Sequence, residues 1–166
     1  MRKICFALAA LLVSSTAQAD GELDKILSQF DKDRLANFDK TRSEALSEGL
    51  RGAPADVEIL TGALDGKPMP MDSGFDMTGT WKCRVIKVGG LLPLTPYGWF
   101  KCRVTDDGSG WSLEKISGSQ RLTGRFFTES ETRLVFVGAG HVNNDPARKY
   151  ASDPKEDQVA VVTRLG

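Results

Sequence analysis

Residues that carry chemistry are scarce in this sequence of 166 residues, which has one histidine, three cysteines and a formal net charge of zero. The single histidine, His141, has no serine or cysteine of recognisable catalytic context beside it, so it is not a candidate general base. Cysteine and histidine also lack the spacing of a metal site. We therefore expect no catalytic residue, no metal and no cofactor, and a protein that is not an enzyme.

Long apolar runs are missing too, and none is long enough to cross a membrane as a helix. The clearest run, residues 4–13, follows Arg2 and Lys3 and precedes Ala-Gln-Ala at residues 17–19. This pattern is typical of a signal peptide. It predicts a leader at residues 1–19, a mature chain that begins at Asp20 without a membrane span, and a periplasmic or secreted location.

An excess of one charge sign is also absent, because removal of Arg2 and Lys3 leaves a net charge of only about −2. This balance argues against nucleic acid as a partner. The charges are unevenly spread. Residues 20–50 carry eight acidic and five basic side chains, whereas residues 79–127 carry eight basic and three acidic ones. A local basic surface therefore remains a candidate binding site.

One pattern occurs twice, as Trp-Lys-Cys-Arg-Val at residues 81–85 and as Phe-Lys-Cys-Arg-Val at residues 100–104. In a strand, alternate side chains point to opposite faces. The aromatic, cysteine and valine residues therefore share one face, and lysine and arginine share the other. Cleavage of the leader would remove Cys5 and leave two cysteines, Cys83 and Cys102. In an oxidising compartment this pair predicts a disulfide.

An antiparallel register with Cys83 opposite Cys102 satisfies the apolar face, because it also pairs aromatic residues with valines. Its two other pairs are Val85 with Phe100 and Trp81 with Val104. Trp81 is expected to plug one end of a barrel core.

The same register pairs Lys82 with Arg103 and Arg84 with Lys101 on the other face. Like charges directly opposite each other are unfavourable. These four residues are therefore a candidate surface for an anion or a partner, either an anionic envelope component or an acidic protein surface. The alternative is a solvated outer face.

A second candidate site follows the predicted turn at Gly118, where Gln120 and Arg121 begin a strand. Glutamine and arginine together can bind a carboxylate, a phosphate or a sugar hydroxyl. The alternative is a turn stabilised by bonds from side chains to the backbone. Asp106 and Asp107 stand before Gly108 and indicate a hairpin turn instead of a catalytic carboxylate pair.

The period of the apolar residues changes along the chain, from helical before residue 66 to alternating after residue 74. We expect a single domain at residues 20–166, with a helical part (20–66), a linker (67–74) and a β-barrel part (75–166). Two apolar runs, at residues 134–137 and 159–162, predict strands covered on both faces, with the helices as cover. The apolar strand at the end also predicts a further hairpin beyond Gly166. The expected strands lie near residues 76–88, 97–106, 110–117, 119–128, 132–141 and 157–165.

The sequence resembles a family of secreted alphaproteobacterial proteins that is catalogued only as a domain of unknown function. The resemblance rests on three motifs: Gly-x-Trp-x-Cys-Arg from Gly79, Tyr-Gly-Trp-Phe-x-Cys-Arg from Tyr97, and Lys-x-x-Gly-Ser-Gln-Arg-x-x-Gly from Lys115. It covers residues 79–141 well and implies a secreted protein without naming an activity. Gly79-Thr80-Trp81 is also similar to the opening of calycin barrels, such as lipocalins and small bacterial metalloprotease inhibitors.

Together these features predict an α+β fold, with N-terminal helices packed on an antiparallel calycin-like barrel or half-barrel. We expect a non-enzymatic periplasmic binding or interaction module that uses the basic strand face. The alternative is a calycin-type inhibitor of a secreted protease.

Overall fold

The computed structural model describes residues 18–71, 74–143 and 145–166. Nearly all of the predicted leader lies outside these residues. Among the described residues, four helices come first and eight strands follow, so the expected α+β class is confirmed. The helices are α1 (Gln18–Ile26), α2 (Gln29–Ala36), α3 (Phe38–Gly49) and α4 (Pro54–Leu64).

Local signals in the sequence explain where the helices begin. The hydroxyl of Ser28 accepts a hydrogen bond from the backbone N–H of Asp31 and caps α2. Pro54 occupies the first turn of α4. Backbone N–H groups in the first turn have no hydrogen-bond partner within the helix, so proline, which lacks an N–H, is well suited to this position.

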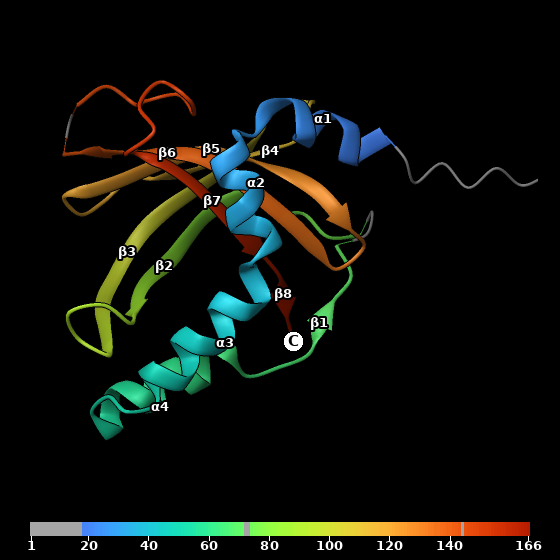
Figure 1. Ribbon diagram of the computed structural model, residues 1–166. Coiled ribbons are helices and arrows are strands. Elements are labelled where there is room, and N and C mark those ends of the chain that lie inside the picture. Colours follow the sequence, from blue (N-terminus) through green and yellow to red (C-terminus); the bar gives the residue numbers. More distant parts are fainter. Residues whose placement is uncertain (1–17, 72–73, 144) are drawn as a thin grey trace, which may run out of the picture.

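Six strands form one antiparallel sheet in sequence order, a meander that curls into a half-barrel (Figure 1). A separate two-stranded ladder joins β1 (Pro68–Met69) to β8 (Arg164–Leu165), so the end of the described chain pairs with the segment expected to be a linker. The strands of the main sheet are β2 (Gly79–Val88), β3 (Leu94–Asp106), β4 (Trp111–Lys115), β5 (Gln120–Ser130), β6 (Arg133–Val142) and β7 (Asp157–Val162).

The predicted register between β2 and β3 is wrong by two residues. Cys83 lies opposite Phe100, and Cys102 lies opposite Trp81. The repeated motif permits both registers, because a shift of two residues keeps every side chain on its face. The sequence-based register ignored the early start of β3 at Leu94 and the irregularity of β2 between Arg84 and Ile86. The predicted disulfide nevertheless forms, between diagonal neighbours whose Cα atoms are 6.0 Å apart.

Trp81 does not plug the core as predicted. Its side chain is 46% exposed, and its indole N–H donates to the backbone oxygen of Met77 at 2.8 Å. The shifted register explains the difference, because it places Trp81 opposite Cys102 near the end of the sheet instead of opposite the buried Val104.

The outer face of β6 is covered by the first helices, as expected. Leu23 of α1 and Leu27, which directly follows that helix, form one buried cluster with Val135 and Val137. Residues 134–137 are all buried, which confirms that this apolar run is covered on both sides. The equivalent prediction for residues 159–162 is wrong, because Ala160 is exposed and its neighbours are only half-buried.

A polar contact ties the long loop between β6 and β7 to the helices. The hydroxyl of Tyr150 donates to the carboxylate of Asp31 at 2.5 Å and accepts from the backbone N–H of Ser28 at 3.0 Å. Asp31 is almost fully buried and also accepts from Arg34. Because the buried Asp31 carboxylate has its hydrogen-bond partners, it can hold α2 in position on the sheet.

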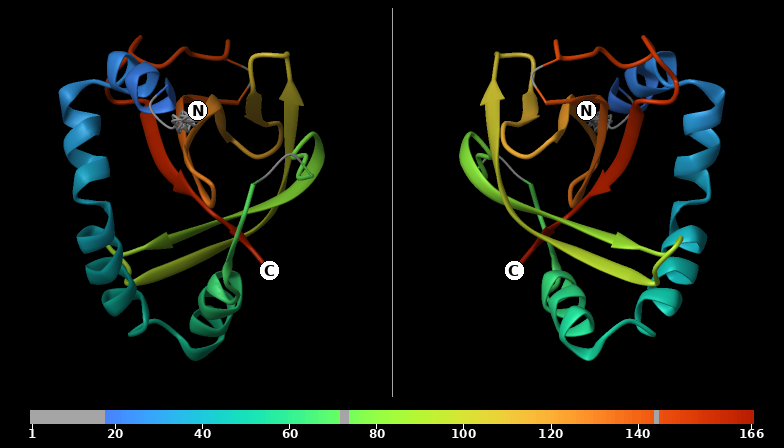
Figure 2. Two further views of the ribbon diagram at one scale, coloured as in Figure 1. Left: turned by 90° about the vertical axis from the view of Figure 1, so that its right-hand side faces the viewer. Right: turned by 90° about the vertical axis from the view of Figure 1, so that its left-hand side faces the viewer.

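The helices also connect the two ends of the curled sheet. Helix α2 contacts β7 at one edge, and α3 contacts β2 at the other. Figure 2 shows α1, α2 and α3 descending along one side of the sheet, from β7 to the β2–β3 hairpin, with α4 below that hairpin. The helices thereby span the distance from one edge of the curled sheet to the other.

Candidate functional site

The basic strand face, defined as Lys82, Arg84, Lys101 and Arg103, projects from β2 and β3. Lys82 and Lys101 face each other directly, which is a like-charge pair that was not expected. Both expected pairs, Lys82 with Arg103 and Arg84 with Lys101, are absent. Arg84 lies opposite Trp99, and Arg103 lies between Thr80 and the acidic Glu114. The prediction that like charges oppose each other along the whole face is therefore wrong.

This face nevertheless stays open to solvent. Lys82, Lys101 and Arg103 are exposed, and none of the four basic residues has an ion pair with another described residue. Arg84 is half-buried because its guanidinium stacks at 5.3 Å from the Trp99 ring and its Nε donates to the backbone oxygen of Tyr97. The face therefore carries positive charge without a carboxylate in salt-bridge contact.

Apolar side chains adjoin the basic strand face on the same hairpin. Leu91 is fully exposed in the connection between the two strands, and Leu92 and Trp99 are 58% and 64% exposed. We call Leu91 and Leu92 the apolar tip; Trp99 lies farther along β3, opposite Arg84. Large apolar side chains that gather in an exposed position commonly mark an interaction site.

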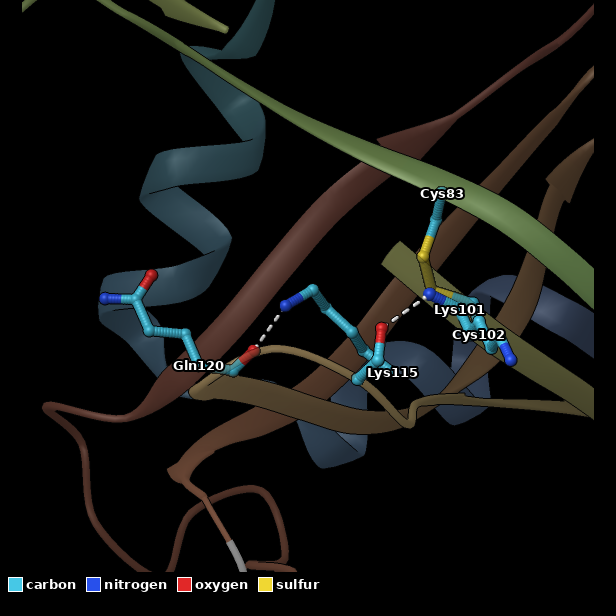
Figure 3. The surroundings of a disulfide bond; sticks show 6 residues. Cys83, Lys101, Cys102, Lys115 and Gln120 are labelled. Atoms are coloured by element: carbon cyan, nitrogen blue, oxygen red, sulfur yellow. Dashed lines mark hydrogen bonds between the residues drawn. A yellow bond between two sulfur atoms is a disulfide. The ribbon is translucent and has the colours of Figure 1, made fainter. Parts of the chain in front are cut away.

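The disulfide lies on the opposite side of these strands. Because side chains alternate, Cys83 and Cys102 point away from the lysines and arginines, and Cys102 is buried. Figure 3 shows the bridge joining the two strands beside Lys115. The backbone N–H of Lys101 donates to the hydroxyl of Ser117 at 2.7 Å and ties β3 to the turn after β4. The basic strand face therefore has a cross-linked support.

Gln120 and Arg121 begin β5, as predicted. Because they are neighbours in a strand, their side chains point to opposite faces of the sheet. The backbone oxygen of Gln120 accepts a hydrogen bond from Lys115 at 2.5 Å, while its side chain points away from that lysine (Figure 3). Arg121 lies opposite His141, and the Nε of Arg121 and the Nδ1 of His141 are buried without a hydrogen-bond partner among the described residues. The structure does not bring these residues together with the basic strand face.

Two adjoining hollows occupy the concave side of the sheet, with volumes of about 210 and 510 Å³. Both are lined by Val85, Lys115 and Gln120. Tyr97, Phe100 and Ser119 complete the smaller one. The larger one includes Lys87, Leu122, Gly140, His141 and Glu156.

Lys115 was not among the residues expected in a site. Only 8% of its surface is exposed, and its Nζ lies 3.8 Å from the centre of the Phe100 ring. Burial, reinforced by the charge of Arg121, lowers the pKa of Lys115 below its ordinary value. The signal was available in the sequence, because Trp111, Leu113 and Lys115 alternate along one strand and put a lysine in an apolar position.

The acidic turn after β3 is structural, as the sequence indicated. Asp107 forms an ion pair with Arg125 at 2.7 Å and accepts bonds from Ser109. Hydrogen bonds from Arg125 and Ser109 hold the pKa of Asp107 far below its ordinary value. Both oxygens of this carboxylate are therefore engaged, by Ser109 in the turn and by Arg125 of β5.

Within the part of the chain that the structure describes, no group of three or more histidine, cysteine or acidic residues has a metal-binding arrangement. Among the same residues, no helix has the length and apolar character needed to cross a membrane.

A family model described as "Domain of unknown function (DUF4893)" matches residues 24–166 of the chain. The match includes the helical part as well as the motifs that suggested such a family. No curated protein and no solved structure matches the chain.

Proposed function

The chain belongs to the DUF4893 family of domains of unknown function, and from its surface we propose that it is a non-enzymatic binding module of the periplasm or the secreted fraction. The module engages an anionic lipid surface of the cell envelope through the β2–β3 hairpin. The observation that carries this proposal is the exposed basic strand face, without ion-pair partners among the described residues, next to the exposed apolar tip.

The exposed side chains of the hairpin are of the kinds that bind a membrane surface. Leu91 and Leu92 are exposed at the tip and suit shallow insertion into the acyl boundary. Trp99 lies farther along β3, and tryptophan favours the level of the headgroups because its ring is apolar and its N–H is polar. The lysines and arginines then face the phosphates, where each contributes about 1 kcal/mol near an anionic surface.

The hairpin is also prepared for binding by its rigidity. The disulfide between Cys83 and Cys102 fixes the two strands, so little conformational entropy remains to be lost on contact. A disulfide is compatible with a protein of an oxidising compartment. The inhibitor alternative lacks a comparable observation, because the first described residues form helix α1, and Leu23 of α1 and the adjoining Leu27 pack against the sheet.

The test is sedimentation of the chain with vesicles of phosphatidylcholine, with and without phosphatidylglycerol, at low and high salt. We expect binding only to the anionic vesicles, weakened by salt because the Debye length shortens. Lys82→Gln/Lys101→Gln removes two exposed charges that oppose each other and should reduce affinity by roughly 30-fold, from about 1 kcal/mol for each charge. Leu91→Ser/Leu92→Ser should weaken binding at both salt concentrations.

The matched control is Lys25→Gln/Lys40→Gln, which makes the same change in net charge at exposed positions of α1 and α3. It should leave vesicle binding unchanged. An equal loss in both lysine variants, or no binding to anionic vesicles, would contradict the proposal. Capture of an acidic protein instead of lipid would reassign the same face, and inhibition in a protease panel would favour the alternative.

A further inference from the structure

The concave side of the sheet holds a second candidate site, independent of the hairpin surface. Its centre is Lys115, which lies where the two hollows adjoin. A buried ammonium is costly unless it is paired or well hydrogen-bonded. Among the described residues, no carboxylate lies within ion-pair distance of Lys115. The positive charge is therefore held in the interior without its usual partner.

The ammonium group still has hydrogen-bonding capacity for a ligand. An ammonium has three N–H donors. Among the described residues, only the backbone oxygen of Gln120 accepts from Lys115, and the Phe100 ring supports the cation from one face. An anion that enters the smaller hollow would meet a donor that is already oriented.

The lining of the smaller hollow defines the class of ligand. Val85, Tyr97 and Phe100 provide apolar and aromatic surface, and Ser119 adds backbone and hydroxyl groups close to Lys115 in the chain. None of its lining residues is acidic, whereas the larger hollow contains Glu156 beside Gly140. A negative charge is therefore favoured in the smaller hollow and disfavoured near Gly140.

Gly118 keeps this hollow in shape. A Cβ at this position would lie 2.7 Å from the Phe100 ring and 3.0 Å from the Nζ of Lys115. Its φ of +84° also favours glycine. A side chain at position 118 would displace both the Phe100 ring and the Lys115 amine. The position of the Lys115 amine therefore depends on glycine at position 118.

We propose that Lys115, on its Phe100 support, binds the carboxylate of a small organic acid whose ring-sized apolar body packs on Val85 and Tyr97. A volume of about 210 Å³ admits a compact aromatic acid. Lys87, whose Nζ lies 5.4 Å from the centre of the Tyr97 ring, adds positive field at the junction with the larger hollow. A charge-assisted hydrogen bond in such a sheltered site is stronger than a neutral one.

The test compares two probes of equal shape, 2-naphthoate and its neutral amide, titrated into the chain labelled with ¹⁵N and followed by NMR. We expect the acid to bind at least about tenfold more tightly than the amide, which corresponds to one charge-assisted bond. The amide signals of Lys115, Gly118 and Gln120 should shift on binding. Equal affinity of the two probes, or shifts confined to the β2–β3 tip, would overturn the proposal.

Lys115→Met keeps the shape of the side chain and removes its charge, so it should abolish the preference for the acid. If this variant does not fold, Lys115→Gln provides the same comparison with a polar side chain. The matched control Lys155→Met alters an exposed loop lysine and should keep the preference. A preference that persists without the Lys115 charge would also overturn the proposal. Because vesicle binding depends on the opposite face, the two proposals can fail separately.

Discussion

The two ends of the sheet are stabilised by different means. At one end, β6 is buried between α1 and the concave interior, and Val135 is completely enclosed. At the other end, β2 and β3 expose a charged outer face and are joined by the disulfide between Cys83 and Cys102. Side-chain packing therefore stabilises β6, whereas a covalent bond stabilises β2 and β3. Because β2 and β3 do not need helical cover on their outer face, that face can carry exposed charges.

This difference follows from the sequence pattern. Residues 134–137 are apolar on both faces and therefore need cover on both sides. The duplicated motif of β2 and β3 is apolar on one face only, so helical cover on the other face would bury lysine and arginine at a high cost. Helices α3 and α4 contact β2 and β3, and at the hairpin end Gly49 lies against Val88 and Gly52 against Leu94.

The largest effect is expected from Gly138→Val in the packed region. A Cβ at this position would collide with the backbone oxygen of Thr123 and lie 2.7 Å from the Phe136 ring. We expect the free energy of unfolding to fall by roughly 3 kcal/mol or more, as for severe overpacking. Urea unfolding measures this change. Gly98→Val on β3 is the matched control, because no atom lies within 4 Å of its added Cβ. Equal losses in the two variants would remove the contrast between the regions.

A loss of about 3 kcal/mol is expected from Cys83→Ser/Cys102→Ser in the cross-linked region. The bond closes a loop across a sequence separation of 19 residues, and its removal restores entropy to the unfolded chain. Urea unfolding with and without a reducing agent measures this contribution. The reducing agent should lower the unfolding free energy of the native chain and leave that of the variant unchanged. Non-reducing peptide mapping should link the two cysteines. Two free thiols in the native protein would refute this account.

A smaller loss, about 1–2 kcal/mol, is expected from Tyr150→Phe, which removes a hydrogen bond to the buried Asp31 carboxylate. Burial raises the pKa of Asp31, but bonds from Tyr150, Ser28 and Arg34 outweigh it and hold the pKa below the ordinary value of 3.8. The stabilisation is therefore complete above pH 3.8 and is lost as the pH falls through the lower pKa of the folded state.

The measurement for this prediction is the difference in unfolding free energy between the native chain and Tyr150→Phe as a function of pH. The difference should shrink as the medium becomes more acidic than pH 3.8. Tyr97→Phe is the control, since the hydroxyl of Tyr97 has no hydrogen bond with any described residue. A difference that does not depend on pH would show that the Tyr150 hydroxyl acts on something other than the Asp31 carboxylate.

The sequence was sufficient to predict most of the fold. Alternation and turn residues located the six strands of the sheet, and the isolated pair of cysteines predicted the disulfide. The register between β2 and β3 was not predictable from the motif, because the repeat fits equally well when shifted by two residues. The exposed position of Trp81 depends on that shift and was missed with it.

The candidate sites were predicted less completely. The exposure of the basic strand face follows from strand alternation, which the sequence displays directly. The hollow at Lys115 depends on the curl of the sheet and on the approach of Phe100 from β3, and neither is encoded in local spacing. In the sequence, only the lysine at an apolar position of β4 indicated this hollow. That indication can be interpreted only when the structure shows that Lys115 faces the concave side of the sheet.

The helical cover of β6 and β7 has a consequence for the order in which the molecule assembles. Each strand of the main sheet pairs with its neighbour in sequence, so hairpins can form one after another at low contact order. The cover is different, because α1 and α2 precede residue 37 while Val159 and Tyr150, which they pack against, come near the end of the chain. The first helices to be synthesised must therefore wait, with Leu23 and Leu27 unburied, until β6 has joined the sheet, and β7 and Tyr150 then complete their contacts.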